Sequence, residues 1–436
     1  DSIKLLTGLR DIEALGVERF PLDPEYQGVH PAIEAELVKR YGYEVGGRIL
    51  TGRARGDVHH TAARLTVRDK LVEVLDEILA LREEILKLAQ QHTDTILPAY
   101  TWFQAAQPTT FAHDLLHIVE GFEANFRHLK GNYREVNTGN CEAGVGCGTA
   151  YPIDRERVAE LLGFEGIIEN TKFAHRDMGI AEVFLMSDLA VLMGHIFRFT
   201  DDLYPLTSQE YGYLELGDEW STTSFIMPQK KNPTSFKSFR FKALKAVSDA
   251  TMGINTYFSS PSNMLGEMSH IGRIAVGQME EHVLPALRHL KGVVPTLTVN
   301  KALAKERAGA YFTQATNLSD TIAAVQNLSF PTAHRIVGVL VREAVKQQIK
   351  PSAITSEMVD QAATEIVGHP IHLDPKLIQE ALDPEIIVRN RKGTGSTGPD
   401  MIKRAIEHRR NAIVEDREWL QAKKAILEQA EQKLMK

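Results

Sequence analysis

Residues 61–93 (TAARLTVRDKLVEVLDEILALREEILKLAQQHT) decide the fold class, because their apolar residues have the spacing of a long amphipathic helix. These residues recur at steps of three and four, which places them along one side of a helix: Leu71, Leu75, Ile78, Leu81, Ile85 and Leu88. The polar residues between them are expected mostly to face away from that side: Arg68, Asp69, Glu73, Asp76, Glu77, Arg82, Glu83 and Glu84. The segment therefore predicts one long helix that packs against others.

Similar helical patterns recur along the chain, whereas strand signals are scarce. Glycines interrupt residues 136–150, where only short β-ribbons are expected. The further helices are expected at residues 176–204, 235–257, 279–291, 301–314 and 399–435. The sequence thus predicts an all-α fold with a central bundle of long helices. We expect three units, namely an N-terminal domain at 1–60, a central helical bundle domain at 61–315 and a C-terminal helical domain at 316–436.

Composition excludes several classes of protein. The chain of 436 residues is 43% hydrophobic and 25% charged, which are ordinary globular values. Its net charge of −7 disfavours nucleic acid as a partner, since such binding draws on positive charge. Two cysteines, Cys141 and Cys147, fit a reducing cytosol rather than a disulfide framework, so a cytoplasmic location is expected. Charged and polar residues interrupt the most apolar segment, 180–197, so we expect a buried helix and no membrane span.

The stretch 224–233 (SFIMPQKKNP) carries the strongest chemical signal. Pro228 and Pro233 fit poorly inside helices, so the stretch is expected to be a loop between them. Two lysines and an asparagine follow a run of hydroxyl residues (221–224), and together these groups make a reasonable cradle for an anion. On composition alone, a solvated basic loop is the alternative.

Residues 227–233 (MPQKKNP) resemble the signature loop of the fumarase/aspartase lyase superfamily, in the form found in argininosuccinate lyases. Two more family regions occur in the same order. Residues 51–57 (TGRARGD) resemble the segment TGRSRND, and residues 100–108 (YTWFQAAQP) resemble YTHLQxAQP. Residues 148–164 match a further structural stretch, and the likeness extends from about residue 30 to about residue 398.

This resemblance implies a homotetramer whose long helices form a common core, with each active site assembled from three subunits. It implies removal of a proton next to a carboxylate, followed by expulsion of an amine or hydroxyl, usually with release of fumarate and without metal or organic cofactor. By position, Lys231 and Asn232 match the residues that hold the substrate carboxylate. Arg55 matches an active-site arginine and Thr101 a substrate-binding threonine.

The sequence departs from the family at positions that carry catalytic or substrate-binding groups. Phe225 stands at the position of the serine that acts as general base, and Trp102 at that of a histidine. Gly56 replaces an asparagine, and Lys237 replaces an acidic residue. A phenyl ring cannot accept a proton, although an indole can still stack on a planar or cationic group. Ordinary argininosuccinate cleavage is therefore not expected.

The general base must then be sought elsewhere, and four residues are candidates. Ser224 is the first choice because the loop around it is otherwise intact, and we group it with Lys231 as catalytic. The others have plain structural alternatives, because they could begin a helix or serve in packing: His59, His60 and Tyr151. The remaining site residues are expected to bind substrate: Arg55, Gly56, Thr101, Trp102, Phe225, Met227 and Asn232.

The expected function is a lyase that acts on a substituted succinate or related dicarboxylate by β-elimination, with a C–N or C–O bond broken. Retention of the carboxylate-binding positions favours this reading. Two alternatives remain open. One is an isomerase, cyclase or decarboxylase of a specialised pathway on the same fold. The other is a non-catalytic homologue of argininosuccinate lyase.

Overall fold

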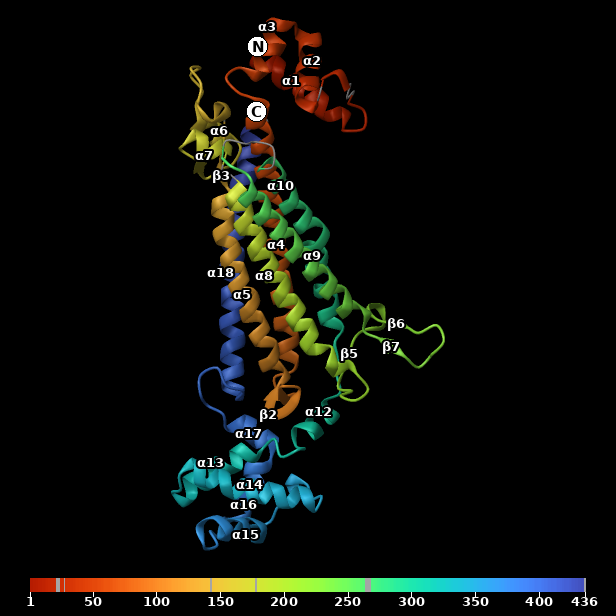
Figure 1. Ribbon diagram of the computed structural model, residues 1–436, viewed down its shortest axis with the longest axis vertical. Coiled ribbons are helices and arrows are strands. Elements are labelled where there is room, and N and C mark those ends of the chain that lie inside the picture. The colour runs from red at the N-terminus through yellow and green to blue at the C-terminus, as the bar shows by residue number, and fades with distance from the viewer. Residues whose placement is uncertain (21–23, 27, 142, 177–178, 263–267, 435–436) are drawn as a thin grey trace.

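The computed structural model describes residues 1–436 except 21–23, 27, 142, 177–178, 263–267 and 435–436. The molecule is elongated, with a bundle of long helices in its middle and smaller helical parts at both ends (Figure 1). The predicted all-α class is confirmed. The longest bundle helices are α4 (Arg55–Gln91), α5 (Phe111–Val136), α8 (Gly179–Leu203), α9 (Thr234–Ser259) and α18 (Pro399–Leu434).

Helix α4 is the axis of this bundle. All six residues of the predicted apolar stripe are buried, and the prediction is confirmed. At its start, the carboxylate of Asp57 accepts a hydrogen bond from the backbone N–H of Ala54 (2.9 Å), which satisfies a donor that the helix leaves unpaired. The prediction was wrong for Arg68 and Arg82, which are buried. Arg82 donates to Asp416 of α18 (2.6 Å). The guanidinium of Arg82 can therefore be buried, because a second helix supplies its partner.

Helix α5 lies beside α4 and was not among the predicted helices. The hydroxyl of Thr110 caps its first turn by accepting from the backbone N–H of His113 (3.2 Å). Its buried apolar residues recur at three- and four-residue steps, as in any amphipathic helix: Leu115, Leu116, Val119, Phe122, Phe126, Leu129, Tyr133 and Val136. The periodic signal was therefore present in the sequence.

Helix α8 is apolar and long enough to cross a membrane, but its place in the fold accounts for its composition. Leu185, Leu189, Leu192 and Ile196 are fully buried against the other bundle helices, as predicted for a core helix. Beside it runs a continuous helical rod made of α10 (Met268–Gly277), a π-helical turn η6 (Gln278–Val283) and α11 (Leu284–Val293). Gln278 ties this rod to α8 and α9 by donating to the carbonyl oxygens of Met186 (3.1 Å) and Ala246 (2.7 Å).

The two ends of the molecule are built from short elements. The N-terminal end contains α1 (Ser2–Leu15), η1 (Pro24–Tyr26), α2 (Val29–Tyr41), α3 (Tyr43–Gly46) and η2 (Gly47–Leu50). Beside it lie β3 (Thr138–Gly139), η3 (Gly144–Gly146), α6 (Arg155–Leu161), β4 (Gly166–Ile167) and α7 (Thr171–Arg176). At the opposite end are α12 (Lys301–Ala308), α13 (Ala315–Gln326), α14 (Phe330–Lys346), η8 (Pro351–Ala353), α15 (Ser356–Val367), α16 (Pro375–Leu382) and α17 (Pro384–Asn390).

The few strands form two-stranded ladders. The largest is the antiparallel hairpin of β1 (Ile96–Thr101) and β2 (Gln104–Thr110). The others are two-residue strands: β3 and β4 pair in parallel, whereas β5 (Leu214–Glu215) pairs with β8 (Thr298–Val299), and β6 (Thr222–Thr223) with β7 (Lys231–Asn232), in antiparallel fashion. Short 3₁₀ turns complete this region: η4 (Pro205–Thr207), η5 (Asp218–Trp220) and η7 (Val294–Thr296).

The core contacts show how the parts of residues 316–436 pack. One apolar core extends from Leu318 to Leu382 and includes residues of α13 to α16. Helix α18 packs its apolar residues into the bundle core. Ion pairs reinforce this contact: Arg417 of α18 donates to Glu83 (2.5 Å), and Lys424 pairs with Asp76. The division of the chain into three domains stays a prediction.

Two features of the bundle interior bear on stability. Arg64 of α4 and Glu182 of α8 form a buried ion pair (3.3 Å), and Arg64 also donates to the carbonyl oxygen of Thr138 (2.9 Å). At the other end of the bundle, Asp114 of α5 and Asp202 of α8 bring two carboxylates together. Burial raises the pKa of Asp114 to about 7, and the charge of Asp202 adds to this rise.

We predict that Glu182→Ala destabilises the protein by roughly 3–5 kcal/mol, because it removes the carboxylate that pairs with the buried guanidinium of Arg64. The measurement is the midpoint of urea unfolding. The matched control is Glu365→Ala, which removes an exposed ion pair with Arg342 (3.3 Å) and should cost less than about 1 kcal/mol. Equal effects of the two substitutions would contradict the prediction.

We also predict that Asp114→Asn alters the pH dependence of stability. An aspartate whose folded pKa is about 7 binds its proton more tightly in the native state than in the unfolded one. Its contribution is fully present below about pH 4 and is lost as pH rises through 7, since stability falls wherever the native state binds more protons. The variant should therefore gain melting temperature over the native sequence at pH 8 but not at pH 4. A gain that is equal at both pH values would refute this assignment.

Candidate active site

The three predicted site regions lie far apart in one chain. We call residues 51–57 the first patch, 100–108 the second patch and 224–233 the third patch. The first patch leads into the N-terminus of α4, and the second lies in the hairpin that follows its C-terminus. Since α4 has 37 residues, about 55 Å of helix separates these two patches. The third patch projects from the side of the bundle on an arm formed by β6 and β7 (Figure 1).

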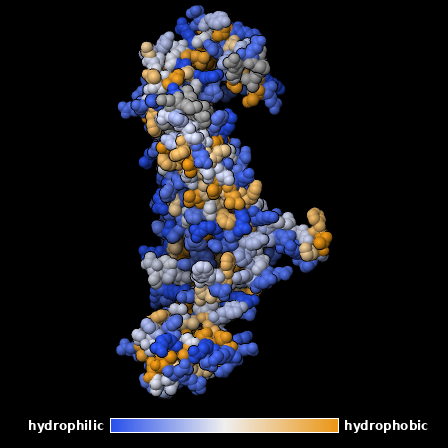
Figure 2. Space-filling model, viewed as in Figure 1, coloured by the Kyte–Doolittle hydropathy of each residue, from blue (hydrophilic) through white to orange (hydrophobic). Residues whose placement is uncertain are grey.

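The third patch forms the tip of this arm. The backbone N–H of Ser224 donates to the carbonyl oxygen of Lys230 (3.2 Å), which closes the loop above the β6–β7 pairs. Phe225 and Ile226 are almost completely exposed at the tip, and Met227 is partly exposed. Hydrophobic surface accordingly gathers at the end of the arm (Figure 2). Ser224 thus lies on an exposed apolar arm, apart from the other candidate bases.

Lys231 lies at the base of this arm in an acidic setting. Its ammonium group contacts Glu215 and Asp218, each at 2.7 Å, and donates to the carbonyl oxygen of Leu216 (2.7 Å). Burial alone would lower the pKa of Lys231, but the hydrogen bonds to Asp218 and Glu215 outweigh this effect and raise the pKa. Lys231 is therefore a permanent cation at neutral pH. It can attract a carboxylate but is a poor proton acceptor.

The second patch contains a tight turn with unusual residues. Thr101 pairs with Gln104, so Trp102 and Phe103 form the two-residue turn between β1 and β2. Their φ angles are 54° and 56°, in the left-handed region where Asn and Gly are the favoured residues. Trp102 is 96% exposed in the single chain. Backbone strain of this kind is concentrated at functional sites, and both rings of the turn are exposed.

A cavity of about 370 Å³ lies next to this turn. Trp102 and Phe103 contribute to one side, and the carboxylates of Asp114 and Asp202 lie within the same lining. Thr101, the predicted substrate-binding residue, is exposed at the end of β1. The second patch therefore offers an aromatic surface and the exposed hydroxyl of Thr101.

The first patch borders a larger cavity of about 670 Å³. Arg55 and Gly56 contribute to its lining, together with both histidines that were proposed as bases, His59 and His60. Tyr151 is exposed close to the first patch, where its Cβ atom lies 3.3 Å from the position that a side chain on Gly52 would take. Three of the four candidate bases therefore lie near this patch.

Two lining residues of the same cavity were missed by sequence reasoning. His175 reaches it from the end of α7, and Arg273 from α10. Neither belongs to a recognisable motif, and only the fold brings them to Arg55. His175 Nδ1 lies 3.1 Å from Asp57 Oδ1, and both side chains are 1% exposed.

The candidate base His60 has the wrong environment for a charged state. Burial lowers the pKa of His60 to about 4, and neighbouring His175 adds to this shift. His60 is therefore neutral at pH 7. Its ring centroid lies 5.2 Å from that of His175, and the Nδ1 atom of His60 has no hydrogen-bond partner among the described residues.

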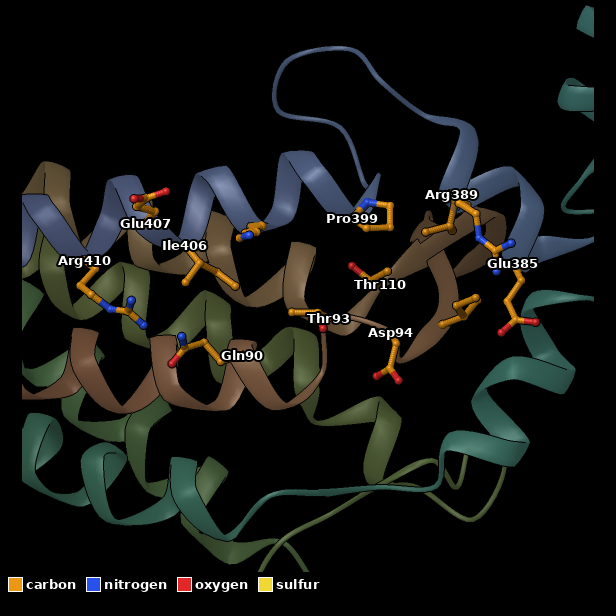
Figure 3. A pocket seen from close by; sticks show the side chains of 13 residues that line it. Gln90, Thr93, Asp94, Thr110, Glu385, Arg389, Pro399, Ile406, Glu407 and Arg410 are labelled. Carbon is orange, nitrogen blue, oxygen red and sulfur yellow. The ribbon is translucent and has the colours of Figure 1, made fainter.

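Another cavity, of about 620 Å³, lies where the end of α4 and the strands β1 and β2 meet α17 and α18 (Figure 3). It contains charges of both signs, including Asp94, Glu385, Arg389 and Arg410. Glu385 is already paired with Lys305 (2.8 Å), and none of the predicted site residues lines this cavity. It is separate from the three patches.

Comparison with known proteins identifies the family to which the chain is similar. Residues 4–248 match the family model described as "Lyase", and residues 312–389 match that of the argininosuccinate lyase C-terminal region. The chain is 32% identical to an argininosuccinate lyase of Methanosarcina mazei, over 100% of this chain and 87% of the relative. It is 31% identical to that of Methanocaldococcus jannaschii, over 93% and 82% of the two chains.

Solved structures give the same result. The crystal structure of EDDS lyase in complex with formate matches with a TM-score of 0.88 and 28% identity, over 99% of this chain and 84% of that one. A 3-carboxy-cis,cis-muconate lactonizing enzyme from Pseudomonas putida shares the fold at a TM-score of 0.68 and 18% identity, over 88% and 82% of the two chains. The chain therefore belongs to the argininosuccinate lyase family within the fumarase/aspartase lyase superfamily.

Proposed function

We propose that the protein is a carbon–nitrogen lyase that eliminates an amine from an N-substituted succinate other than argininosuccinate and releases fumarate. The observation that carries this proposal is the protonated Lys231, which is retained with Asn232 in the third patch while Phe225 fills the position of the serine base. Proton removal next to a carboxylate builds negative charge on that carboxylate, and a fixed cation stabilises it. A structural homologue has no need of such a cation.

The comparisons support the type of reaction. The relatives are argininosuccinate lyases, and a variant of the structurally similar EDDS lyase has been described with bound fumarate. Both names point to lyases, and the second to a dicarboxylate ligand. We extend this chemistry to the present chain on the strength of Lys231, Asn232, Arg55 and Thr101.

The replaced positions define the expected difference in substrate. Phe225 and Trp102 are exposed aromatic residues at positions that are polar in the family. If the patches of different subunits meet, these rings line the pocket and favour a leaving amine with an apolar, aromatic or cationic group. A guanidinium or amine can stack on the indole face, whereas a small polar amine gains little from either ring.

The proposal includes a homotetramer, because one chain cannot join its own patches. Apolar residues of α8 and α9 remain exposed in the single chain, and such surface typically marks an interface: Phe184, Val191, Phe241, Leu244, Val247 and Phe258. On α9 they recur at the three- and four-residue steps of a helix-packing face. Hydrophobic surface is visible over this part of the bundle in Figure 2.

The loss of the serine base also favours a second candidate, an isomerase or cyclase on the same fold. Phe225 cannot accept a proton, so a reaction that needs only the carboxylate clamp is compatible with the third patch. Restoring a serine at position 225 and a histidine at position 102 separates the two candidates. If the protein is an isomerase or cyclase, this double variant should lose the native turnover and should form no fumarate.

The direct test is formation of fumarate by the purified protein from a panel of N-substituted aspartates, and its consumption in the reverse direction with the corresponding amines. We expect turnover with aromatic or cationic amines and little with argininosuccinate. Lys231→Ala should lower turnover by roughly 10²- to 10³-fold, because a group that stabilises developing charge is lost. Failure of the whole panel in both directions would refute the lyase assignment.

A second test concerns the sharing of sites between subunits. Arg55→Ala and Lys231→Ala should each be nearly inactive, but co-expression of the two variants should restore part of the activity, since some mixed sites receive both native patches. The matched control is co-expression of Lys231→Ala with Asn232→Ala, which share one patch and should restore nothing. Equal activity of both mixtures would count against shared sites.

A further inference from the structure

His175 lies in the wall of the cavity that Arg55 lines, and it contacts the buried carboxylate of Asp57. The two residues are 118 positions apart in sequence, and the fold brings the end of α7 against the first turn of α4 to join them. Nδ1 of His175 lies 3.1 Å from Oδ1 of Asp57. Both side chains are buried, so this contact is shielded from water.

The surroundings keep Asp57 ionised. Burial alone would raise the pKa of Asp57, but hydrogen bonds from His175 and from the backbone N–H groups of Ala54 and Val145 outweigh it and lower the pKa. Asp57 is therefore ionised and accepts a hydrogen from Nδ1 of His175. This contact directs Nδ1 toward the carboxylate and leaves Nε2 as the ring nitrogen that can accept a proton.

The Nε2 atom of His175 is buried and has no hydrogen-bond partner among the described residues. A buried polar atom without a partner destabilises the folded state, so a hydrogen-bonding group that reaches it is stabilising. A group supplied by a ligand, next to this cavity wall, would satisfy it.

The backbone around the pair is adapted to it. A Cβ atom on Gly56 would lie 3.0 Å from Cε1 of His175, so a side chain at position 56 would require the imidazole to shift by a few tenths of an ångström. Val145, which supplies one N–H to Asp57, has a φ angle of 56°, a conformation that a β-branched residue adopts only under strain. Strain that aims a donor at a buried carboxylate is typical of functional sites.

The charged groups around the cavity suit an anionic substrate. Arg55 and Arg273 are cations in its lining, and His59 lies in the same lining. His60, the nearest imidazole, is held neutral by burial. Asp57 is the carboxylate in contact with His175, so its charge compensates an imidazolium.

We propose that His175, oriented by Asp57, is the proton acceptor of the composite active site. This inference rests on the proposed lyase function. The lone pair of Nε2 takes the proton from the carbon next to the substrate carboxylate, and the released C–H electron pair forms the double bond of fumarate. The C–N bond breaks with its electron pair on nitrogen, and the amine takes a proton from solvent. Asp57 stabilises the resulting imidazolium.

The experiment compares the native protein with His175→Gln, His175→Ala and Asp57→Asn. We expect kcat for fumarate formation to fall roughly 10²- to 10⁴-fold in both His175 variants while KM changes little, as for loss of a general base. Asp57→Asn should also lower kcat and should shift the acid limb of the pH–rate profile. Added imidazole should restore part of the turnover of His175→Ala, which a purely structural role would not permit.

The matched control is His92→Gln. His92 is another buried histidine, bonded through Nδ1 to Thr95 (2.9 Å), and it lies at the far end of α4 from this cavity. It should keep native turnover. A native protein that forms fumarate, with His175→Gln within a few-fold of it in kcat, would overturn the inference and leave the lyase function standing.

One further experiment applies if the native protein forms no fumarate. Solvent deuterium exchange into succinate is then followed by NMR, since it reports proton removal without elimination. Exchange by the native protein that is lost in His175→Gln supports the inference although the lyase function has failed. Exchange that is absent, or unchanged in the variant, overturns it.

Discussion

The rigid length of α4 is the constraint on which the rest of the structure depends. A helix of 37 residues holds the first patch about 55 Å from the hairpin that carries the second. Its apolar face is buried along the bundle, and buried arginines tie it to neighbouring helices, so it cannot shorten or bend to join the patches. Chemistry that needs both patches must therefore be built between chains, with the bundle serving as the spacer that sets the position of each part.

The exposed groups follow from the same constraint. A strained turn displays Trp102 and Phe103, an arm displays Phe225, and Lys231 is held by its own chain's carboxylates. In an isolated chain the aromatic rings are exposed to water, which is unfavourable, and the ammonium group of Lys231 is already paired. In an assembly, burial of the rings offsets the strain, and an incoming carboxylate competes with Glu215 and Asp218 for the lysine. The proposed shared site would give these groups partners that the single chain does not supply.

Much of this fold could be predicted from the sequence, because long helices carry their signal in local periodicity. The buried stripe of α4 and the ends of α8, α9 and α18 agree with that signal to within a few residues. The β1–β2 hairpin was not foreseen, since Trp and Phe occupy turn positions where Asn and Gly are expected. The burial of Arg82 depends on a partner 334 residues away, and the Asp57–His175 contact joins residues 118 apart. Such contacts are products of tertiary packing and leave no local pattern.

The close fit between Gly56 and His175 has a consequence for how this site can change. With only 3.0 Å between Cε1 of the imidazole and a Cβ atom at position 56, a side chain there would require the imidazole to shift by a few tenths of an ångström. The two positions are therefore coupled. A substitution at position 56 alters the placement of His175, and so its effect depends on which residue stands at position 175.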